Sequence, residues 1–317
     1  MRICIGVCTR NRPQMLRELL ESFATIQIPQ GTSVIFGIVE NNSEKTSAKI
    51  IAACLGNHKV IYQLQPQLGI PFARNHVLEI SEQEGCDFTT FVDDDEVVNH
   101  TWLVELLAET TSRELDLVGG PVEILPVPGR STWLQRSINS CLNRQFDKFE
   151  QRNARRHAAG TDHQILLYTN NWMVRNSFLE KSGVRFDERL GLSGGSDVSF
   201  CRAATKTGAR TGWAPKAVAS ERMSPERLSI LYQYQRARDQ SLSSFRLKYP
   251  HRNIKVVVKV VGSMIYRVCR GLVLGVLSLP TLGFTIASSC QNLGFAMGRL
   301  KGLFGYHSTH YQSVQGS

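Results

Sequence analysis

Three consecutive aspartates, Asp93, Asp94 and Asp95, are the residues whose type and spacing most clearly indicate chemistry. They follow the apolar pair Phe91-Val92, which is typical of the end of a buried strand. Adjacent carboxylates repel one another unless a cation joins them. Carboxylate oxygens are ligands of Mg²⁺ or Mn²⁺, and such ions usually hold substrate phosphates as well. The run therefore favours a metal and phosphate site, with a solvated acidic turn as the alternative.

Arginines follow other apolar runs of the N-terminal half, at Arg10, Arg12 and Arg74. Cations and a metal facing one pocket would imply an anionic ligand. The chain has no GxxxxGK[ST] run and no GxGxxG after a strand. P-loop and Rossmann dinucleotide-binding sites therefore lose their main support.

The elements that must position these residues alternate along the first 125 positions. Apolar runs predict strands over residues 3–8, 34–40, 60–64, 88–92 and 117–122. Between them, helical patterns cover residues 13–24, 44–55, 72–81 and 101–110. Such alternation predicts an α/β fold with a mostly parallel sheet flanked by helices, whose ligands bind beyond the carboxyl ends of the strands. We expect the polar residues after these strands to converge there.

The positive charge of the chain is concentrated at its C-terminal end. The formal net charge is +10, yet the first 239 residues carry 28 basic and 27 acidic side chains. Asp239 is the last acid, and nine basic residues follow it. A nucleic-acid-binding protein would place its cations on a face with base-stacking aromatics. Here they accompany an apolar tail, so we expect no nucleic-acid partner.

The tail itself has the composition of a membrane-associating helical segment. Between Arg270 and Arg299 lie 28 uncharged residues, more than the roughly 20 that a spanning helix needs. Glycines and Pro280 interrupt this stretch, which argues against one straight helix. Basic residues just upstream, among them Lys255 and Lys259, resemble those of an interfacial helix. Spanning and lying on the membrane both stay open, as does a soluble helical appendage that docks on the body.

The remaining composition favours a cytoplasmic protein. The N-terminal apolar run is only six residues long before Arg10 and Arg12, so it is not a signal peptide. The eight cysteines form no CxxC pair and no zinc-finger spacing, which fits a reducing compartment. We therefore expect a cytoplasmic location at the inner face of the cell membrane, peripheral or integral through the C-terminal segment.

An ordered set of seven motifs extends over residues 1–240. In chain order the motifs are Thr9-Arg10-Asn11-Arg12, Val39-Glu40-Asn41-Asn42-Ser43, Leu68-Gly69 with Ala73-Arg74-Asn75, Phe91-Val92-Asp93-Asp94-Asp95, Asn170-Asn171-Trp172-Met173-Val174-Arg175, Arg185-Phe186-Asp187-Glu188 and Gly194-Gly195-Ser196-Asp197. This set resembles glycosyltransferase family 2, the inverting enzymes of GT-A fold, and within it the bacterial exopolysaccharide enzymes. The resemblance implies a donor-binding half over about 1–123, an acceptor half over about 124–240 and a separate tail over 241–317.

The resemblance also implies roles for individual residues. Asp95 would hold the Mg²⁺ or Mn²⁺ ion, and Asp197 would be the catalytic base. The UDP-sugar donor would be bound by Thr9, Arg10, Arg12, Glu40, Asn42, Arg74, Asp93 and Asp94. Glu40 stands where an aspartate is more usual, and Ser196 replaces the glutamate of an acidic pair.

Transfer of a sugar from a nucleoside diphosphate needs an activated acceptor hydroxyl and a stabilised leaving group. Metal and arginines would serve the leaving group. The carboxylate of Asp197 would take the proton of the acceptor hydroxyl, and one displacement would invert the anomeric configuration. Asp197 could instead be a helix N-terminal residue favoured by the helix dipole. From the tail and the family resemblance, we expect a lipid-linked saccharide acceptor at the cytosolic membrane surface.

Further candidates surround this set. Trp172 could offer an aromatic wall to a sugar, with core burial as its alternative, and Glu221 could contact the diphosphate or the acceptor. We expect an irregular basic insert over residues 126–164 that could close over the donor. Ser196 also keeps open a noncatalytic nucleotide-sugar-binding or scaffold protein, and strand-end carboxylates occur in nucleotidyltransferases too.

Overall fold

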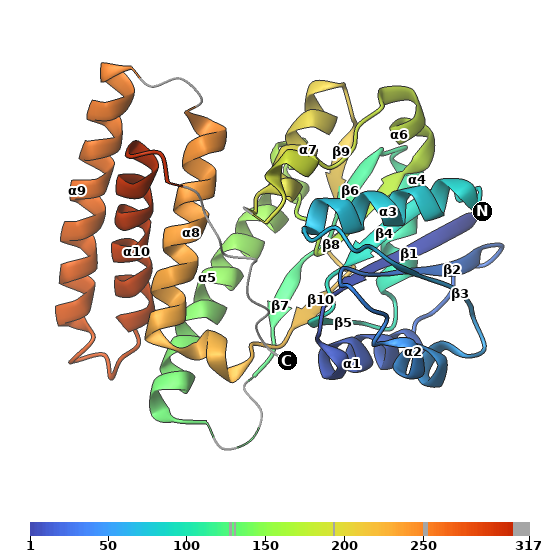
Figure 1. The fold of residues 1–317 in the computed structure, drawn as a ribbon, viewed down its shortest axis with the longest axis horizontal. Coiled ribbons are helices and arrows are strands. Elements are labelled where there is room, and N and C mark those ends of the chain that lie inside the picture. Colours follow the sequence, from blue (N-terminus) through green and yellow to red (C-terminus); the bar gives the residue numbers. More distant parts are fainter. Residues whose placement is uncertain (127–128, 130, 193, 250–252, 307–317) are drawn as a thin grey trace.

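A mixed sheet forms the centre of the N-terminal part. The computed structural model describes residues 1–306 except for 127–128, 130, 193 and 250–252. The strands of this sheet are β1 (Arg2–Thr9), β2 (Ser33–Glu40), β3 (Lys59–Leu64), β4 (Phe88–Val92), β6 (Leu117–Gly119), β8 (Asn171–Arg175) and β9 (Thr211–Trp213). Among the described residues their order is β3-β2-β1-β4-β8-β6-β9 (Figure 1). Only β8 runs antiparallel to its neighbours, so the expected α/β class with a mostly parallel sheet is confirmed.

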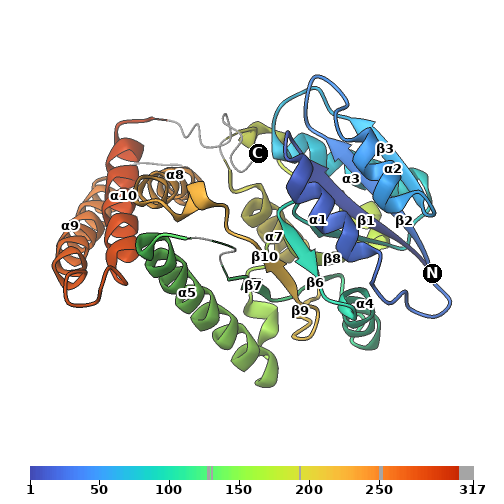
Figure 2. The ribbon, with the colours of Figure 1, turned by 90° about the horizontal axis from the view of Figure 1, so that it is seen from below.

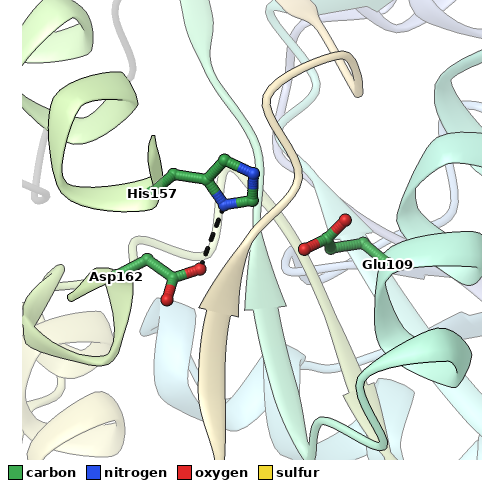
Figure 3. Close-up of side chains that lie close together, drawn as sticks. All are labelled: Glu109, His157 and Asp162. Carbon is green, nitrogen blue, oxygen red and sulfur yellow. Dashed lines mark hydrogen bonds and ion pairs between the residues drawn. The ribbon is translucent and has the colours of Figure 1, made fainter. Parts of the chain in front are cut away.

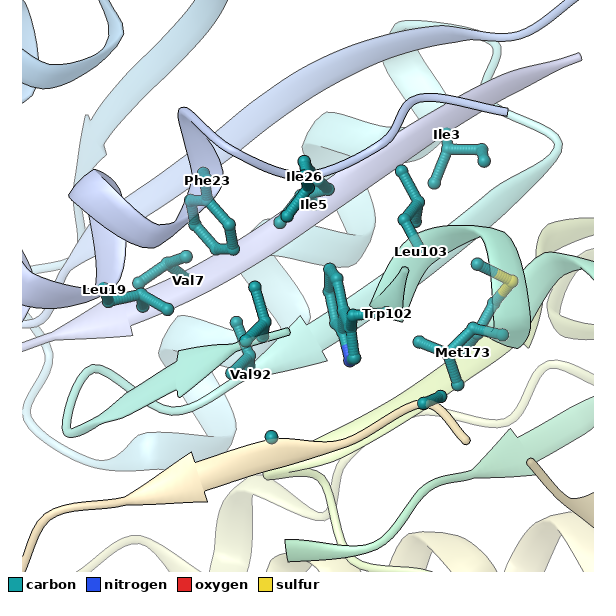
Figure 4. Close-up of a cluster of buried hydrophobic side chains, with 14 of the residues drawn as sticks. Ile3, Ile5, Val7, Leu19, Phe23, Ile26, Val92, Trp102, Leu103 and Met173 are labelled. Carbon is teal, nitrogen blue, oxygen red and sulfur yellow. The ribbon is translucent and has the colours of Figure 1, made fainter. Parts of the chain in front are cut away.

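Helices cover both faces of the sheet. One face packs against α1 (Pro13–Phe23), α2 (Ala48–Leu55) and α4 (Trp102–Ser112), and the other against α3 (Ile70–Gln83), α6 (Asn176–Ser182) and α7 (Ser196–Lys206). Side chains of β1 alternate between the faces, so Ile3 and Ile5 enter the first layer and Cys4 the second. Figure 4 shows Ile5 with Phe23 of α1 and Trp102 of α4 in the first layer. This packing fixes the strand ends from which the site is built.

The boundaries of β1 to β4 follow the sequence prediction closely. Helix α2 and the strand predicted over residues 117–122 depart from it. The helix expected from residue 44 begins at Ala48, because the Glu40 carboxylate accepts the backbone N–H groups of Thr46 and Ser47 ahead of it. The strand expected over 117–122 is divided into β6 and β7 (Val122–Ile124). The division falls at Gly120, where a Cβ atom would lie 2.3 Å from a backbone oxygen of Ala217.

A second, three-stranded sheet and a long helix extend the fold beside the strand ends. The sheet has the order β5-β10-β7, with β5 (Glu96–Val98) and β10 (Ala219–Glu221). The expectation of an irregular insert over 126–164 was wrong, because most of it forms α5 (Trp133–Ala158). Thr132 and Gln135 form a capping box at its start, and Ile138, Cys141 and Leu142 bury its apolar face. No glycine or proline interrupts residues 133–158.

Three helices side by side form the C-terminal part: α8 (Ile230–Lys248), α9 (Ile254–Leu277) and α10 (Ile286–Leu303). Figures 1 and 2 both show α10 between α8 and α9, with α9 outermost. Gly294, Gly298 and Gly302 of α10 face α8, and a Cβ atom at Gly298 would lie 2.1 Å from the Arg238 oxygen. The boundary expected at residue 240 thus falls inside α8. By length and composition alone, α9 could cross a membrane.

Candidate active site

The carboxyl ends of β1 and β4 open into a cavity of about 740 Å³. Asp95, which follows β4, and Asp197, in the first turn of α7, both line it. The two carboxylates therefore share one cleft, as a transfer reaction between them would need. The predicted residues that line this cavity are Thr9, Arg10, Arg12, Arg74, Asp93, Asp94, Asp95, Asp197 and Glu221.

The three aspartates after β4 are held by side chains from separate parts of the chain. Arg12 donates from Nη1 to Asp94 Oδ1 at 2.9 Å, and the Thr9 hydroxyl donates to Asp94 Oδ2 at 2.8 Å. Arg74 lies 3.4 Å from Asp93 Oδ1. Asp94 is thus bound to the end of β1, whereas the Asp93 side chain is 42% exposed and faces the cavity.

Arg227 is a residue of this site that the sequence analysis missed. It lies in the short helix η3 (Pro225–Leu228) and pairs with Asp95 Oδ2 and with Glu221 Oε1, both at 2.7 Å. The Arg227 side chain is only 9% exposed, so this bridge is buried. Arg227 therefore joins Glu221, at the end of β10, to the aspartates that follow β4, and these four carboxyl groups form one acidic cluster.

Burial and charge divide these carboxyl groups into two kinds. Burial raises the pKa of Asp94 to about 6 against the opposing effect of Arg12, and burial together with Asp95 raises the pKa of Glu221 to about 6. Burial also acts on Asp95, but Arg227 and Arg12 outweigh it and hold the pKa of that carboxyl below its usual value. Asp95 therefore stays ionised to a lower pH than Asp94 and Glu221.

The donor set fits an oxygen-coordinated divalent cation. Asp93 and Asp95 both present carboxylate oxygens to the cavity, and Glu221 lies beside them. Four carboxyl groups of the cluster, Asp93, Asp94, Asp95 and Glu221, pair with three arginines, Arg12, Arg74 and Arg227. Hard oxygen ligands with residual negative charge are what Mg²⁺ and Mn²⁺ take in proteins.

Two glycines place Asp197 at the wall of the cavity. Gly194 and Gly195 have φ values of 79° and 87°, the left-handed region that glycine adopts readily. Helix α7 begins directly after them, and Asp197 Oδ1 accepts the N–H of Val198 at 2.9 Å. The Ser196 hydroxyl accepts a hydrogen bond from Arg74 at 3.1 Å. Ser196 thus helps to fix Arg74.

Glu40 and Asn42 lie outside the cavity lining. The Glu40 carboxylate accepts hydrogen bonds from the Thr46 hydroxyl and backbone, Ser47 N–H and the Tyr62 hydroxyl. Asn42 donates to the side-chain oxygen of Asn11 at 2.7 Å. In this arrangement Glu40 shapes the segment that follows β2.

Trp172 takes the alternative given for it, burial in the core, and does not line the cavity. Its side chain is 0% exposed and packs with Phe186 and Phe200, with ring centroids 5.9 and 4.8 Å away. Asn171, its neighbour in β8, lines the cavity instead, because alternate residues of a strand face opposite sides. Phe149 of α5 and Tyr168, with ring centroids 6.2 Å apart, are among the aromatic residues that line the cavity.

A separate acidic group, Glu109, His157 and Asp162, lies away from this cavity (Figure 3). Their ligand atoms lie within 4.8 Å of one another, as in a metal site. However, Arg113 lies 2.6 Å from both Glu109 and Asp162, and His157 Nδ1 lies 3.1 Å from Asp162. The guanidinium already supplies the positive charge, so this group joins α4 to the end of α5 as an ion-pair cluster.

Comparison with known proteins gives the family. The family model described as "Glycosyltransferase like family 2" matches residues 2–241. The chain belongs to glycosyltransferase family 2. It is 28% identical over 234 residues to the succinoglycan biosynthesis protein ExoM of Rhizobium meliloti (strain 1021), covering 73% of this chain and 70% of ExoM. The prediction that the protein is a glycosyltransferase with a GT-A type sheet is thus confirmed.

Solved structures of S. aureus TarS share the fold. TarS residues 1–349 in complex with UDP and with UDP-GlcNAc match with a TM-score of 0.51 and 16% identity. These matches cover 95% of this chain and 91% and 92% of the TarS chains. Against a longer TarS chain the match covers 94% of this chain and 55% of TarS, again with a TM-score of 0.51.

Proposed function

We propose that this family 2 glycosyltransferase moves a sugar, with inversion and with a divalent metal ion, from a UDP-sugar to a lipid-linked saccharide in bacterial exopolysaccharide synthesis. The observation that carries the proposal is that Asp95, whose pKa is held below its usual value, and Asp197 line the same cavity. The name of ExoM supports the pathway, and the UDP and UDP-GlcNAc complexes of TarS support the donor class.

The donor half, about residues 1–123, would hold the nucleotide and its diphosphate. Arg12 and Arg74 reach the cavity from the ends of β1 and α3 and offer charged donors to phosphate oxygens. Asp93 and Asp95 would hold the ion, which supplies positive charge to the departing diphosphate. Thr9 and Arg10 line the same end of the cavity, whereas Glu40 would act there by shaping the chain after β2.

The acceptor half, about residues 124–240, would supply the base and the acceptor wall. Asp197 would remove the proton from the acceptor hydroxyl as its oxygen attacks the anomeric carbon from the face opposite the diphosphate. A UDP α-sugar would then give a β-linkage. Tyr168 lies close enough to Asp197 for its pKa to be raised, first by burial and then by the Asp197 charge. Phe149 and Tyr168 would therefore carry the acceptor sugar beside the base.

Membrane association of the tail would bring a lipid-linked acceptor to this cavity. Arg236, Asp239 and Gln240 of α8 line the cavity, and α8 packs through α10 against the apolar helix α9. The catalytic cavity and the apolar surface are thus two sides of one helical layer. This arrangement supports a cytoplasmic enzyme acting at the inner face of the membrane.

The test is UDP release by the full-length protein in detergent, with a panel of UDP-sugars and Mn²⁺, with and without membrane lipid extract. We expect release from one donor, increased by the extract and lost with EDTA. Asp197→Asn should lower transfer by about 10²- to 10⁴-fold, the usual contribution of a general base, while UDP binding stays unchanged. Asp147→Asn, an exposed residue of α5 outside the cavity lining, is the matched control.

The second candidate is a noncatalytic nucleotide-sugar-binding protein of the same fold, which Ser196 favours because it removes an acidic neighbour of Asp197. UDP-sugar binding without release from any donor, in the presence of extract and Mn²⁺, would favour this candidate. Normal transfer by Asp197→Asn would show that another group is the base.

A further inference from the structure

We propose that α9 lies flat on an anionic lipid bilayer as an in-plane anchor and does not cross it. This inference rests on the membrane association in the proposed function and specifies its mode and its lipid. It follows from the exposed face of α9, from the charges beside that face, and from what covers the opposite face.

An apolar stripe runs along the whole outer face of α9. Its members are spaced three or four residues apart, so that they share one side of the helix. They are exposed by 39 to 74%: Ile254, Val258, Val261, Ile265, Val268, Leu272 and Val276. Leu279 and Leu282 in the following turn are each 80% exposed and continue the stripe. Only 11% of the most apolar window of α9 is buried, so α9 is not a core helix.

Basic residues flank this stripe on one side. Lys255, Lys259 and Arg270 are exposed, and the sequence contains no acid after Asp239. A helix with an apolar face and a basic flank binds at the headgroup level of a bilayer, and anionic lipid adds to the attraction. The charges therefore select an anionic membrane surface as the partner of this face.

The opposite side of α9 is held by polar and close contacts to α10. The Ser289 hydroxyl donates to the Gly271 oxygen at 2.7 Å, and Arg267 donates to Asn292 at 3.0 Å. A Cβ atom at Gly271 would lie 2.9 Å from the Leu293 side chain. Helix α10 is joined as closely to α8 through its glycines, so the three helices form one layer.

This layer is incompatible with a spanning α9. A bilayer placed across the axis of α9 would also enclose α10 and α8, which run beside it (Figures 1 and 2). Helix α8 carries Arg236, Arg238 and Asp239, and it forms a wall of the polar cavity. Charged side chains at the bilayer centre are strongly unfavourable. With α9 in the plane of the surface, all of these groups stay in water.

The binding test uses the full-length protein and flotation with two kinds of vesicle. We expect binding to phosphatidylglycerol mixed with phosphatidylethanolamine and much weaker binding to phosphatidylcholine. Lys259→Gln should lower the partition coefficient about fivefold, the equivalent of about 1 kcal/mol per basic residue. Leu272→Gln should lower it as well, whereas Leu231→Gln, an exposed leucine of α8, is the matched control.

The depth test distinguishes lying on the membrane from crossing it. A fluorophore is attached at Val258→Cys, Ile265→Cys or Leu272→Cys, each in a Cys269→Ser background because Cys269 is exposed. Successive positions are seven residues, or about 10 Å, apart along the helix. Quenching by lipid nitroxides should report the same shallow depth at all three positions. A depth at residue 265 about 10 Å greater than at the other two would overturn the proposal.

Membrane extraction, vesicle binding and oligomeric state distinguish the in-plane mode from its alternatives. Release of the bound protein by alkaline carbonate supports the in-plane mode, and retention with a protease-protected α9 contradicts it. Absence of vesicle binding would overturn the proposal that this face binds a membrane surface. A dimer that forms without lipid and that Leu272→Gln dissociates would show instead that the apolar stripe binds a second copy of the chain. Donor-dependent UDP release in detergent is measured on the same variants, so failure of the membrane mode is separate from failure of the transferase function.

Discussion

Replacement of Arg227 by glutamine should destabilise the protein strongly, because it leaves two buried carboxylates without their shared counter-charge. Arg227 lies 2.7 Å from both Asp95 and Glu221, and the three side chains are 8 to 10% exposed. Removal of one member of a buried ion pair costs about 3–5 kcal/mol. The pKa of Glu221 is already raised to about 6, so protonation of Glu221 offsets part of the loss. We therefore expect Arg227→Gln to lower the free energy of unfolding by about 3 kcal/mol at neutral pH.

The assay is urea unfolding in EDTA, followed by circular dichroism, with Arg222→Gln as the matched control. Arg222 is 45% exposed and lies 3.4 Å from Glu18, so its loss should cost about 0–1 kcal/mol. Mn²⁺ should restore more stability to Arg227→Gln than to the unsubstituted protein, because the cation replaces the missing charge at Asp95. Equal destabilisation by the two substitutions would refute the reasoning about a buried bridge.

Glu150→Gln on α5 tests a buried charge, and Gly298→Leu on α10, with Gly262→Ala as its control, tests helix packing. Burial raises the pKa of Glu150 on α5 to about 7, so its neutral form stabilises the fold below about pH 4.5 and this contribution is lost as the pH rises through about 7. Glu150→Gln should therefore gain stability relative to the unsubstituted protein between pH 5 and pH 8 in urea unfolding, and a constant difference would contradict the assignment. Gly298→Leu should cost at least 1–3 kcal/mol by overpacking α10 on α8. Gly262→Ala, where no atom lies within 4 Å, should be neutral or stabilising by thermal denaturation.

The sheet and its strand-end residues were predictable because each inner strand is a continuous apolar run with polar residues directly after it. That pattern follows from burial on both faces of a parallel sheet, which is why β1, β2 and β4 lie where the sequence places them. It also brought Arg12, Arg74 and Asp95 to one cavity. The division between β6 and β7 depended on how closely the Ala217 backbone approaches Gly120, which no local pattern contains.

The missed features depend on contacts between distant parts of the chain. Arg227 follows Asp95 by 132 positions and belongs to no motif, so only the fold shows their pairing. Helix α5 has a narrow buried face among many charged residues, which hides the apolar period in the sequence. Both faces of β8 meet a core layer, with Met173 in the first and Trp172 in the second, and the register of β8 with β4 and β6 fixes which residue enters which layer.

Binding of Mn²⁺ in the presence of UDP, measured by electron paramagnetic resonance, tests the central claim most directly. The unsubstituted protein should bind Mn²⁺ more tightly when UDP is present, because Asp93, Asp95 and the diphosphate would hold the ion together. Asp95→Asn should lower this affinity at least about tenfold, a loss of about 1.4 kcal/mol, whereas Asp197→Asn should retain it. Equal Mn²⁺ affinity of Asp95→Asn and the unsubstituted protein would contradict a metal-held diphosphate at the end of β4.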